Sequence, residues 1–427
     1  MSSHYRVTTI VMSSGERLPM LLGADGLPMF EPTVFALSEI RARNRASNTI
    51  ESYLRSVMVL LRFLGLRKID LQVRLDEGRL LSLGEIEELT RICRLPMELI
   101  QAMRDDAESS SMKVAPVVSL EKLRMRSSGM FDSEVSPAAA ATRLRNIRDY
   151  IKWLGLNRMS RHGVNVSLRS SLASSVQQIV DAIDARLPSD GHYLIEQREG
   201  LAQEVVNLIL KVVEPQSANN PWHDEHCRYR NELIILWLLY LGLRKGELLN
   251  IRISDIDFRQ STVTVARRAD DISDPRKNQP KVKTRGREIP LSTELLDKTN
   301  AYIMNQRSGI RGARKHDFLF VSEDKGQPMS VPSLAKLFNV LRSKCPDLPR
   351  NIFPHIFRHT WNDRFSEEMD AKRVGAETEK KTRSFLMGWS ETSGTAATYT
   401  RRHIKKKAAK ASLKLQEGLM SMEKKDE

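Results

Sequence analysis

The sequence predicts a mainly α-helical protein with a small β-sheet, an α+β fold in which a helical domain precedes a second domain that contains the sheet. Three observations predict it. The chain has 427 residues, more than one compact domain usually spans. Apolar residues recur at helical spacing through most of the first 160 positions. After position 260, several short segments alternate between apolar and polar residues instead.

Residues 1–30 mix Gly, Pro, Met and short β-branched pieces without a clear period. We expect them to form an irregular N-terminal arm without a core. From about Pro32 the spacing becomes helical, first in TVFALSEIRARN and then in TIESYLRSVMVLLRFLG. Asn48 or Thr49 can cap this second helix, and Gly65 is expected to end it.

Residues 31–160 are expected to form one helical domain. LSLGEIEELTRICR and PMELIQAMRDD continue the helical pattern, and a polar break follows at residues 108–116. Another strong helix opens at Ser136, with a proline in its first turn, and closes at Gly155. We predict that it is the last main helix of this domain.

Residues 161–190 are serine-rich and are predicted to be a linker with room for one helix. The second domain, residues 191–405, begins with helical patterns. Its segment RYRNELIILWLLYLGL is so apolar that the helix must be buried. STVTVARR, TRGREIPLS and DFLFVSE are strand candidates, and helices resume at Ser330 and Pro354. Residues 406–427 are a basic, then amphipathic tail.

The composition is that of a globular protein, with 41% hydrophobic and 28% charged residues. No apolar run is long enough to cross a bilayer, and the N-terminus has no secretion signal, so we expect a cytoplasmic protein without a membrane span. Cys93, Cys227 and Cys345 are not spaced like a metal clip or a disulfide framework. No cluster of residues in the sequence resembles a metal site for hydrolysis, and we expect no metal and no cofactor.

The net charge of +15 and the pI of about 9.7 favour a polyanionic partner, because cationic side chains that neutralise phosphates release counterions. DNA, RNA or an anionic membrane would each satisfy this charge. The choice between them depends on motifs.

Four segments of the second domain carry candidate functional residues. In LGLRKGELLNIRISDID, Arg244 follows the buried helix at a glycine-containing corner, where its guanidinium can either fork onto two phosphate oxygens or cap helix carbonyls. In KVKTRGREIPLS, Lys283 precedes a turn and a short strand, and Lys281 and Arg285 compete with it.

The third segment, FPHIFRHTW, places His355 and Arg358 three residues apart and therefore on one helical face. Because a proline precedes His355, this histidine is expected at the positive end of the helix, where an anion is favoured. The fourth segment, FLMGWSETSGTAATYTRRH, contributes Trp389 and Tyr399. A tyrosine near a helix end often serves packing alone.

In this order, the four segments resemble the tyrosine recombinase (phage integrase) family over about residues 225–405. The resemblance implies that Arg244, Lys283, His355, Arg358, Trp389 and Tyr399 form the catalytic site. Trp389 stands where the family usually has histidine, and its distance from Tyr399 is one residue longer than expected. The N-terminal domain resembles the family only in its helical character. The family has a small helical bundle at this place, which grips DNA.

The implied activity is site-specific recombination. Tyr399 would attack a backbone phosphate, two arginines would neutralise the transition state, Lys283 would protonate the leaving 5′-oxygen and His355 would act as base. The partners would be double-stranded DNA and further recombinase subunits, identical or related, in a tetramer that exchanges strands through a Holliday junction. Integration or excision of a mobile element is the expected purpose. A type IB topoisomerase-like enzyme and an inactive DNA-binding protein are the alternatives.

Overall fold

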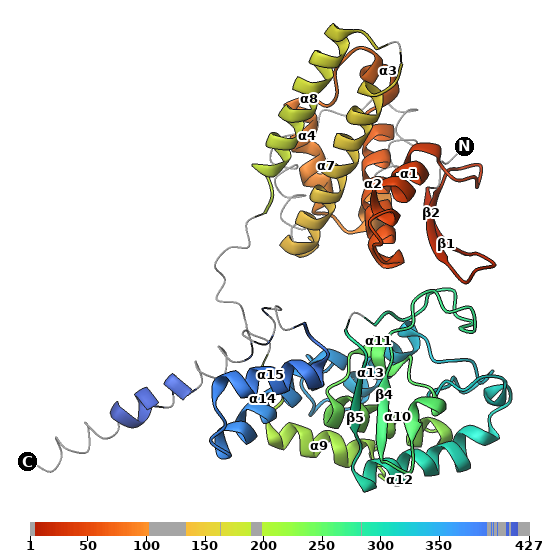
Figure 1. Cartoon of the computed structure of the whole chain (residues 1–427), viewed down its shortest axis with the longest axis vertical. Coiled ribbons are helices and arrows are strands. Elements are labelled where there is room, and N and C mark those ends of the chain that lie inside the picture. Colours follow the sequence, from red (N-terminus) through yellow and green to blue (C-terminus); the bar gives the residue numbers. More distant parts are fainter. Residues whose placement is uncertain are drawn as a thin grey trace, which may run out of the picture. The chain divides into compact units, whose positions relative to one another are not determined.

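The computed structural model describes residues 5–101, 134–162, 164–188, 199–282, 284–390, 394, 396, 399, 407–409 and 411–416. The chain divides into two compact units, Met1–Tyr193 and Leu194–Glu427 (Figure 1). Both units are mainly helical and each contains a small antiparallel sheet. The predicted fold class, mainly α with a small β-sheet, is therefore confirmed.

A β-hairpin opens the first unit, where the sequence had predicted an irregular arm. Strands β1 (Arg6–Val11) and β2 (Arg17–Leu22) pair antiparallel, and Leu18 and Leu21 of β2 are buried in the core of the unit. The prediction failed because β2 is buried on both faces, which removes the alternation that marks a half-buried strand.

Helices form the rest of the first unit. Ser82 caps one of them in a reciprocal capping box with Glu85, and Ser136 caps another through a hydrogen bond of 3.3 Å from the amide of Ala139. The helical elements are α1 (Phe30–Phe35), η1 (Ala36–Arg41), α2 (Ser47–Leu66), α3 (Leu71–Asp76), α4 (Leu83–Cys93), α7 (Pro137–Met159) and α8 (Val166–Asp184).

Helices α7 and α8 correct two predictions. Val166–Asp184, within the predicted linker of residues 161–190, form α8, which packs along α7 and buries Leu172 and Ile183 in the core of the first unit. Gly155 does not end α7, which continues to Met159. A Cβ atom at Gly155 would lie 2.3 Å from Cγ2 of Val176. The glycine therefore permits the close approach of two helices.

The second unit is built around α10, which is buried on almost all sides and ends near the site described below. A three-stranded antiparallel sheet in the order β3-β4-β5 lies beside it (Figure 1). Its main elements are α9 (Gln203–Val213), α10 (Glu225–Leu241), α11 (Lys245–Leu248), β3 (Ile256–Asp257), β4 (Thr262–Val265), β5 (Arg287–Pro290), α12 (Thr293–Ala301), α13 (Val331–Lys344), α14 (Pro354–Ala371) and α15 (Ala376–Met387).

The third strand candidate, DFLFVSE, is not a strand. Its backbone makes isolated bridges, from Phe318 to Arg252 and from Val321 to Pro328, and Phe318, Leu319 and Phe320 are buried by neighbouring elements. Short helical turns occupy the chain before it, at η4 (Tyr302–Gln306), η5 (Arg307–Gly309) and η6 (Ala313–Lys315). Among the described helices, none has the length and apolarity that crossing a membrane requires.

Candidate active site

The site begins where α10 ends. Gly242 adopts a left-handed conformation with φ of 59° and turns the chain into α11, for which Arg244 is the N-terminal cap residue. The amide of Arg244 donates to Oε2 of Glu247 at 2.9 Å, and its Nη1 lies 3.6 Å from Oε1 of the same carboxylate. Nη1 is buried and has no hydrogen-bond acceptor among the described residues. The guanidinium is therefore available to an anion.

Glu247 joins the basic residues of the site. Its side chain is fully buried, Arg287 donates to it from Nη2 at 3.0 Å, and Nη1 of Arg358 lies 3.8 Å away. The hydroxyl of Thr284 also contacts its carboxylate. Burial alone would raise the pKa of Glu247, but Arg287 and the other donors hold it below its ordinary value. Glu247 is thus ionised and fixes the positive groups around it.

The sequence analysis missed the structural role of Arg287. This residue is the first of β5 and is buried together with Ile289, two positions further on the same strand face. Its Nε donates to the backbone oxygen of Leu386 at 2.6 Å, so it ties the sheet to the end of α15. One sequence signal could have revealed this role. Arg287 occupies the same strand face as the apolar Ile289, so its side chain is directed into the core.

Arg358 is the most deeply buried of the predicted site residues. Its Nη1 donates to the oxygen of Gly242 at 2.7 Å and its Nη2 to the oxygen of Met387 at 3.1 Å, so α14 is tied to the ends of α10 and α15. Nε is buried without an acceptor among the described residues. Burial, and then Arg244, lower the pKa of Arg358 to about 9, which still leaves it cationic at neutral pH.

Trp389 and Tyr399 complete the cluster. Gly388 ends α15 with φ of 64°, and its oxygen accepts from the amide of Arg285 at 3.0 Å. The rings of Trp389 and Tyr399 stack with centroids 5.5 Å apart and an interplanar angle of 13°. The guanidinium carbon of Arg358 lies 5.2 Å from the tryptophan ring on which it packs. Nε1 of Trp389 is a further buried donor without an acceptor among the described residues.

The phenol of Tyr399 is held by His359. Its hydroxyl is 3.0 Å from Nδ1 of His359, and only 8% of the tyrosine surface is exposed. Tyr399 also acts electrostatically on Arg244 and Arg358. Burial lowers the pKa of both arginines, and the nearby phenol opposes that effect. The tyrosine therefore lies within electrostatic reach of both guanidinium groups.

His355 was expected to be the base, but the hydrogen bond that the structure shows for the phenol goes to His359 instead. His355 lies one turn earlier on α14, is exposed, and contacts His359 with ring centroids 4.6 Å apart. The motif contained both histidines. Because residues four apart share a helical face, spacing alone could not decide which one meets the tyrosine.

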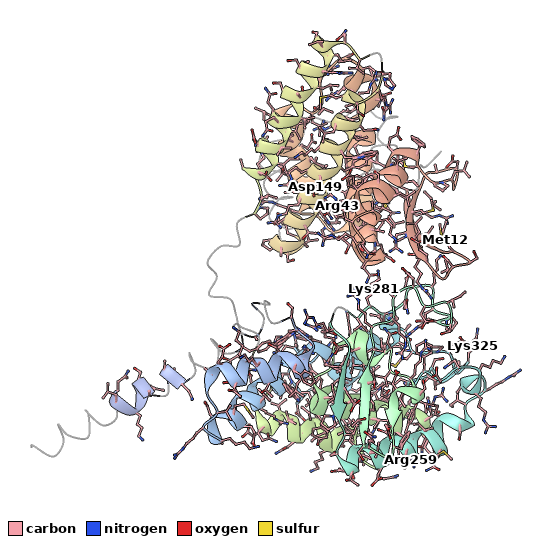
Figure 2. All side chains as sticks on the ribbon, in the orientation of Figure 1. Met12, Arg43, Asp149, Arg259, Lys281 and Lys325 are labelled. Carbon is pink, nitrogen blue, oxygen red and sulfur yellow. The ribbon has the colours of Figure 1, made fainter. Side chains whose placement is uncertain are left out.

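Lys283 lies outside the described residues. The chain on both sides of it is fixed next to Glu247, because Val282 and Thr284 are buried and the Thr284 hydroxyl contacts the carboxylate. Gly246 makes this possible, since a Cβ atom there would lie 2.2 Å from the oxygen of Lys281. Figure 2 shows Lys281 and Arg259 at opposite ends of this unit.

The structure thus brings Arg244, Arg358, Trp389 and Tyr399 into one continuous cluster, with His355 at its edge. Three of its buried donor nitrogens have no acceptor among the described residues. Buried donors without acceptors are costly, so this arrangement suits a bound anion with several oxygens. A phenol beside such an anion is placed for nucleophilic attack on it.

Comparisons with known proteins find similar sequences for the second unit. Residues 200–405 match the sequence profile of the phage integrase family. A tyrosine recombinase of Pseudothermotoga lettingae is 26% identical over 132 residues, which cover 31% of this chain and 38% of that protein. Tyrosine recombinase XerD of Halalkalibacterium halodurans is 23% identical over 143 residues, 34% of this chain and 42% of that one. The matches thus span about two fifths of the length of these relatives.

Two solved recombinase structures share a low similarity with the chain. XerA recombinase is 18% identical with a TM-score of 0.36, and the match covers 63% of this chain and 82% of that one. The Tn1549 transposon integrase in complex with circular intermediate DNA is 16% identical with a TM-score of 0.40, covering 75% of this chain and 95% of that one.

Proposed function

We propose, from the membership of residues 200–405 in the tyrosine recombinase (phage integrase) family, that this chain is a site-specific DNA recombinase that uses Tyr399 as its nucleophile. One observation carries the proposal. The phenol of Tyr399 lies beside three buried donor nitrogens that lack acceptors among the described residues, on Arg244, Arg358 and Trp389. A DNA phosphate has the charge and the nonbridging oxygens that these donors would satisfy.

The reaction follows from this placement. The oxygen of Tyr399 attacks the phosphorus, the bond to the 5′-oxygen breaks, and a 3′-phosphotyrosyl link forms. Arg244, Arg358 and Trp389 stabilise the charge of the pentacoordinate transition state, and Lys283 protonates the departing 5′-oxygen. One phosphoester replaces another, so a free 5′-hydroxyl from a second duplex can reverse the step without ATP. Strands are thereby exchanged.

His359 is the proton acceptor in this mechanism. A phenol in water ionises only near pH 10, so attack at neutral pH needs a base within hydrogen-bond reach. Nδ1 of His359 is 3.0 Å from the hydroxyl of Tyr399. His355, in the exposed first turn of α14, is instead placed near the positive end of the helix and would contact the phosphate.

The first unit would supply further contacts to double-stranded DNA. A surface hollow of about 830 Å³ is lined by β1, α2 and α7 and includes Arg6, Arg55, Arg62 and Arg143. A concave basic surface of this kind suits the phosphate backbone. We expect the protein to act in the cytoplasm, in a tetramer of identical or related subunits on two DNA sites, and to integrate or excise a mobile element.

A suicide substrate tests the activity. Nicked duplexes from the DNA that flanks the gene are incubated with wild-type protein and with Tyr399→Phe, and covalent adducts are resolved on denaturing gels. A wild-type adduct that Tyr399→Phe lacks, with DNA binding unchanged, supports the proposal. Binding without any adduct would leave only a DNA-binding protein. Adducts that reseal but never join two duplexes would indicate a topoisomerase-like enzyme.

A further inference from the structure

A second cluster of reactive side chains lies at the N-terminal end of α10. This helix is 17 residues long, and Arg244 of the candidate active site follows its C-terminal end. One ligand atom from each of Asp224, His226 and Cys227 lies within 4.8 Å of the others. The carboxylate of Glu323 contacts the sulfur of Cys227. We propose that these four residues form a structural site for a divalent zinc ion, which the recombination chemistry does not use.

The first support is an unsatisfied buried nitrogen. Only 6% of His226 is exposed, and its Nε2 is 3.2 Å from the hydroxyl of Tyr302. Its Nδ1 is buried and has no hydrogen-bond partner among the described residues. A buried polar atom without a partner costs free energy unless something fills the position. With Nε2 oriented by a hydroxyl, Nδ1 is the nitrogen left to bind a metal.

The second support is the environment of the sulfur. Cys227 is 96% buried, yet its neighbours are polar, because Glu323 contacts the sulfur and Nη2 of Arg230 lies 3.3 Å from it. An arginine donor is matched best by a thiolate. With zinc bound to one thiolate, two carboxylates and a neutral imidazole, the site has one net negative charge, which Arg230 neutralises.

Zinc binding would release the thiol proton of Cys227 to solvent. A metal–sulfur bond would then replace the sulfur–hydrogen bond.

The donor set and its position define the role. One sulfur, one imidazole nitrogen and two carboxylate oxygens suit four-coordinate zinc better than the hard cations magnesium and calcium. Asp224 and Glu323 are exposed, which gives the ion a path from solvent. Glu323 lies in the turn between Val321 and Pro328, which also carries the labelled Lys325 (Figure 2). The ion would tie this turn to the start of α10.

Cobalt binding tests the site in the full-length protein. Chelator-treated wild type is titrated with Co²⁺, and the thiolate-to-cobalt charge-transfer absorption is followed. We expect saturation at one ion per chain and displacement by Zn²⁺. Cys227→Ser should abolish the band, and the matched control Cys93→Ser, a buried cysteine of the first unit, should retain it. Absence of the band in wild type, or an equal band in Cys227→Ser, would overturn the proposal.

A second measurement covers the case in which Cys227→Ser fails to fold. Glu323→Gln changes an exposed residue and preserves its shape. Zn²⁺ should raise the melting temperature of wild type and of Lys325→Gln, an exposed control on the same turn, and should raise that of Glu323→Gln by less than half as much. Equal shifts in Glu323→Gln and wild type would exclude Glu323 as a ligand and contradict the proposed site.

Discussion

Glu247 places one buried carboxylate among three arginines, and it contacts Arg287, Arg358 and Arg244 at 3.0, 3.8 and 3.6 Å. Such a carboxylate orients positive groups that would otherwise repel one another. Its removal leaves buried cations without compensation, which is more costly than the loss of the hydrogen bonds alone.

We predict that Glu247→Gln lowers the free energy of unfolding by about 3 kcal/mol. Urea unfolding measures it, and the exposed Glu288→Gln on β5 should change stability little. The pKa of Glu247 is lowered in the folded protein, so its contribution is present above the unfolded pKa and is lost as pH falls through the folded value. The difference between wild type and Glu247→Gln should therefore shrink in acid. A difference that persists unchanged in acid would contradict this charge-based account.

The two histidines of α14 are predicted to act differently. His359→Gln should slow single-turnover cleavage by about 100-fold, because the phenol loses its proton acceptor. His355→Gln leaves the contact between His359 and the phenol in place and should slow cleavage less. If His355→Gln instead slowed cleavage as much as His359→Gln, our assignment of the base would be wrong.

At the scale of elements, glycines decide how closely segments approach. Gly155 on α7 faces Val176 of α8, and a Cβ atom there would lie 2.3 Å from the valine methyl group. Gly65 on α2 has more space. No atom beyond its own helix backbone and its chain neighbours lies within 4 Å of the place where a Cβ atom would be. The two residues look alike in the sequence, since each lies near the end of a helical pattern.

We predict opposite outcomes for these glycines. Gly155→Ala should destabilise the first unit by about 2 kcal/mol, because the helices must separate or the valine must move. Gly65→Ala should be neutral or stabilise the protein by up to about 1 kcal/mol, because alanine favours a helix. Thermal and urea unfolding of both variants provide the measurement. A Gly155→Ala protein as stable as wild type would show that α7 and α8 are not closely packed.

At the scale of the whole molecule, the net charge of +15 would make the proposed DNA binding dependent on salt. Arg55 lines the hollow of the first unit and pairs with Glu51 at 2.7 Å, whereas Arg259 lies at the end of the second unit opposite Lys281 (Figure 2). A phosphate contact through Arg55 would release about one counterion.

We predict that Arg55→Ala weakens DNA binding and reduces the slope of log K against log salt concentration by about 0.9, the value for one phosphate contact. Arg259→Ala removes the same charge and should leave the slope unchanged. Fluorescence anisotropy over a range of salt concentrations measures both. Equal effects in the two variants would mean that the hollow has no special part in binding.

Much of the helical structure of both units could be predicted from local patterns. The buried helix that became α10, the caps at Ser136 and Ser330 and the start of α14 at Pro354 depend on residues within a few positions of one another. The hairpin of residues 6–22 and the packing of α8 could not be predicted, because both depend on what covers them from distant parts of the chain.

The sequence by itself determined the fold class and named Arg244, Arg358, Trp389 and Tyr399, because motif order and short-range period are written along the chain. Only the tertiary structure decided that His359 meets the phenol and that Glu247 and Arg287 hold the arginines in place. His359 and Tyr399 are 40 positions apart in the sequence, and so are Glu247 and Arg287. Packing at such separations depends on the whole core and leaves no local pattern.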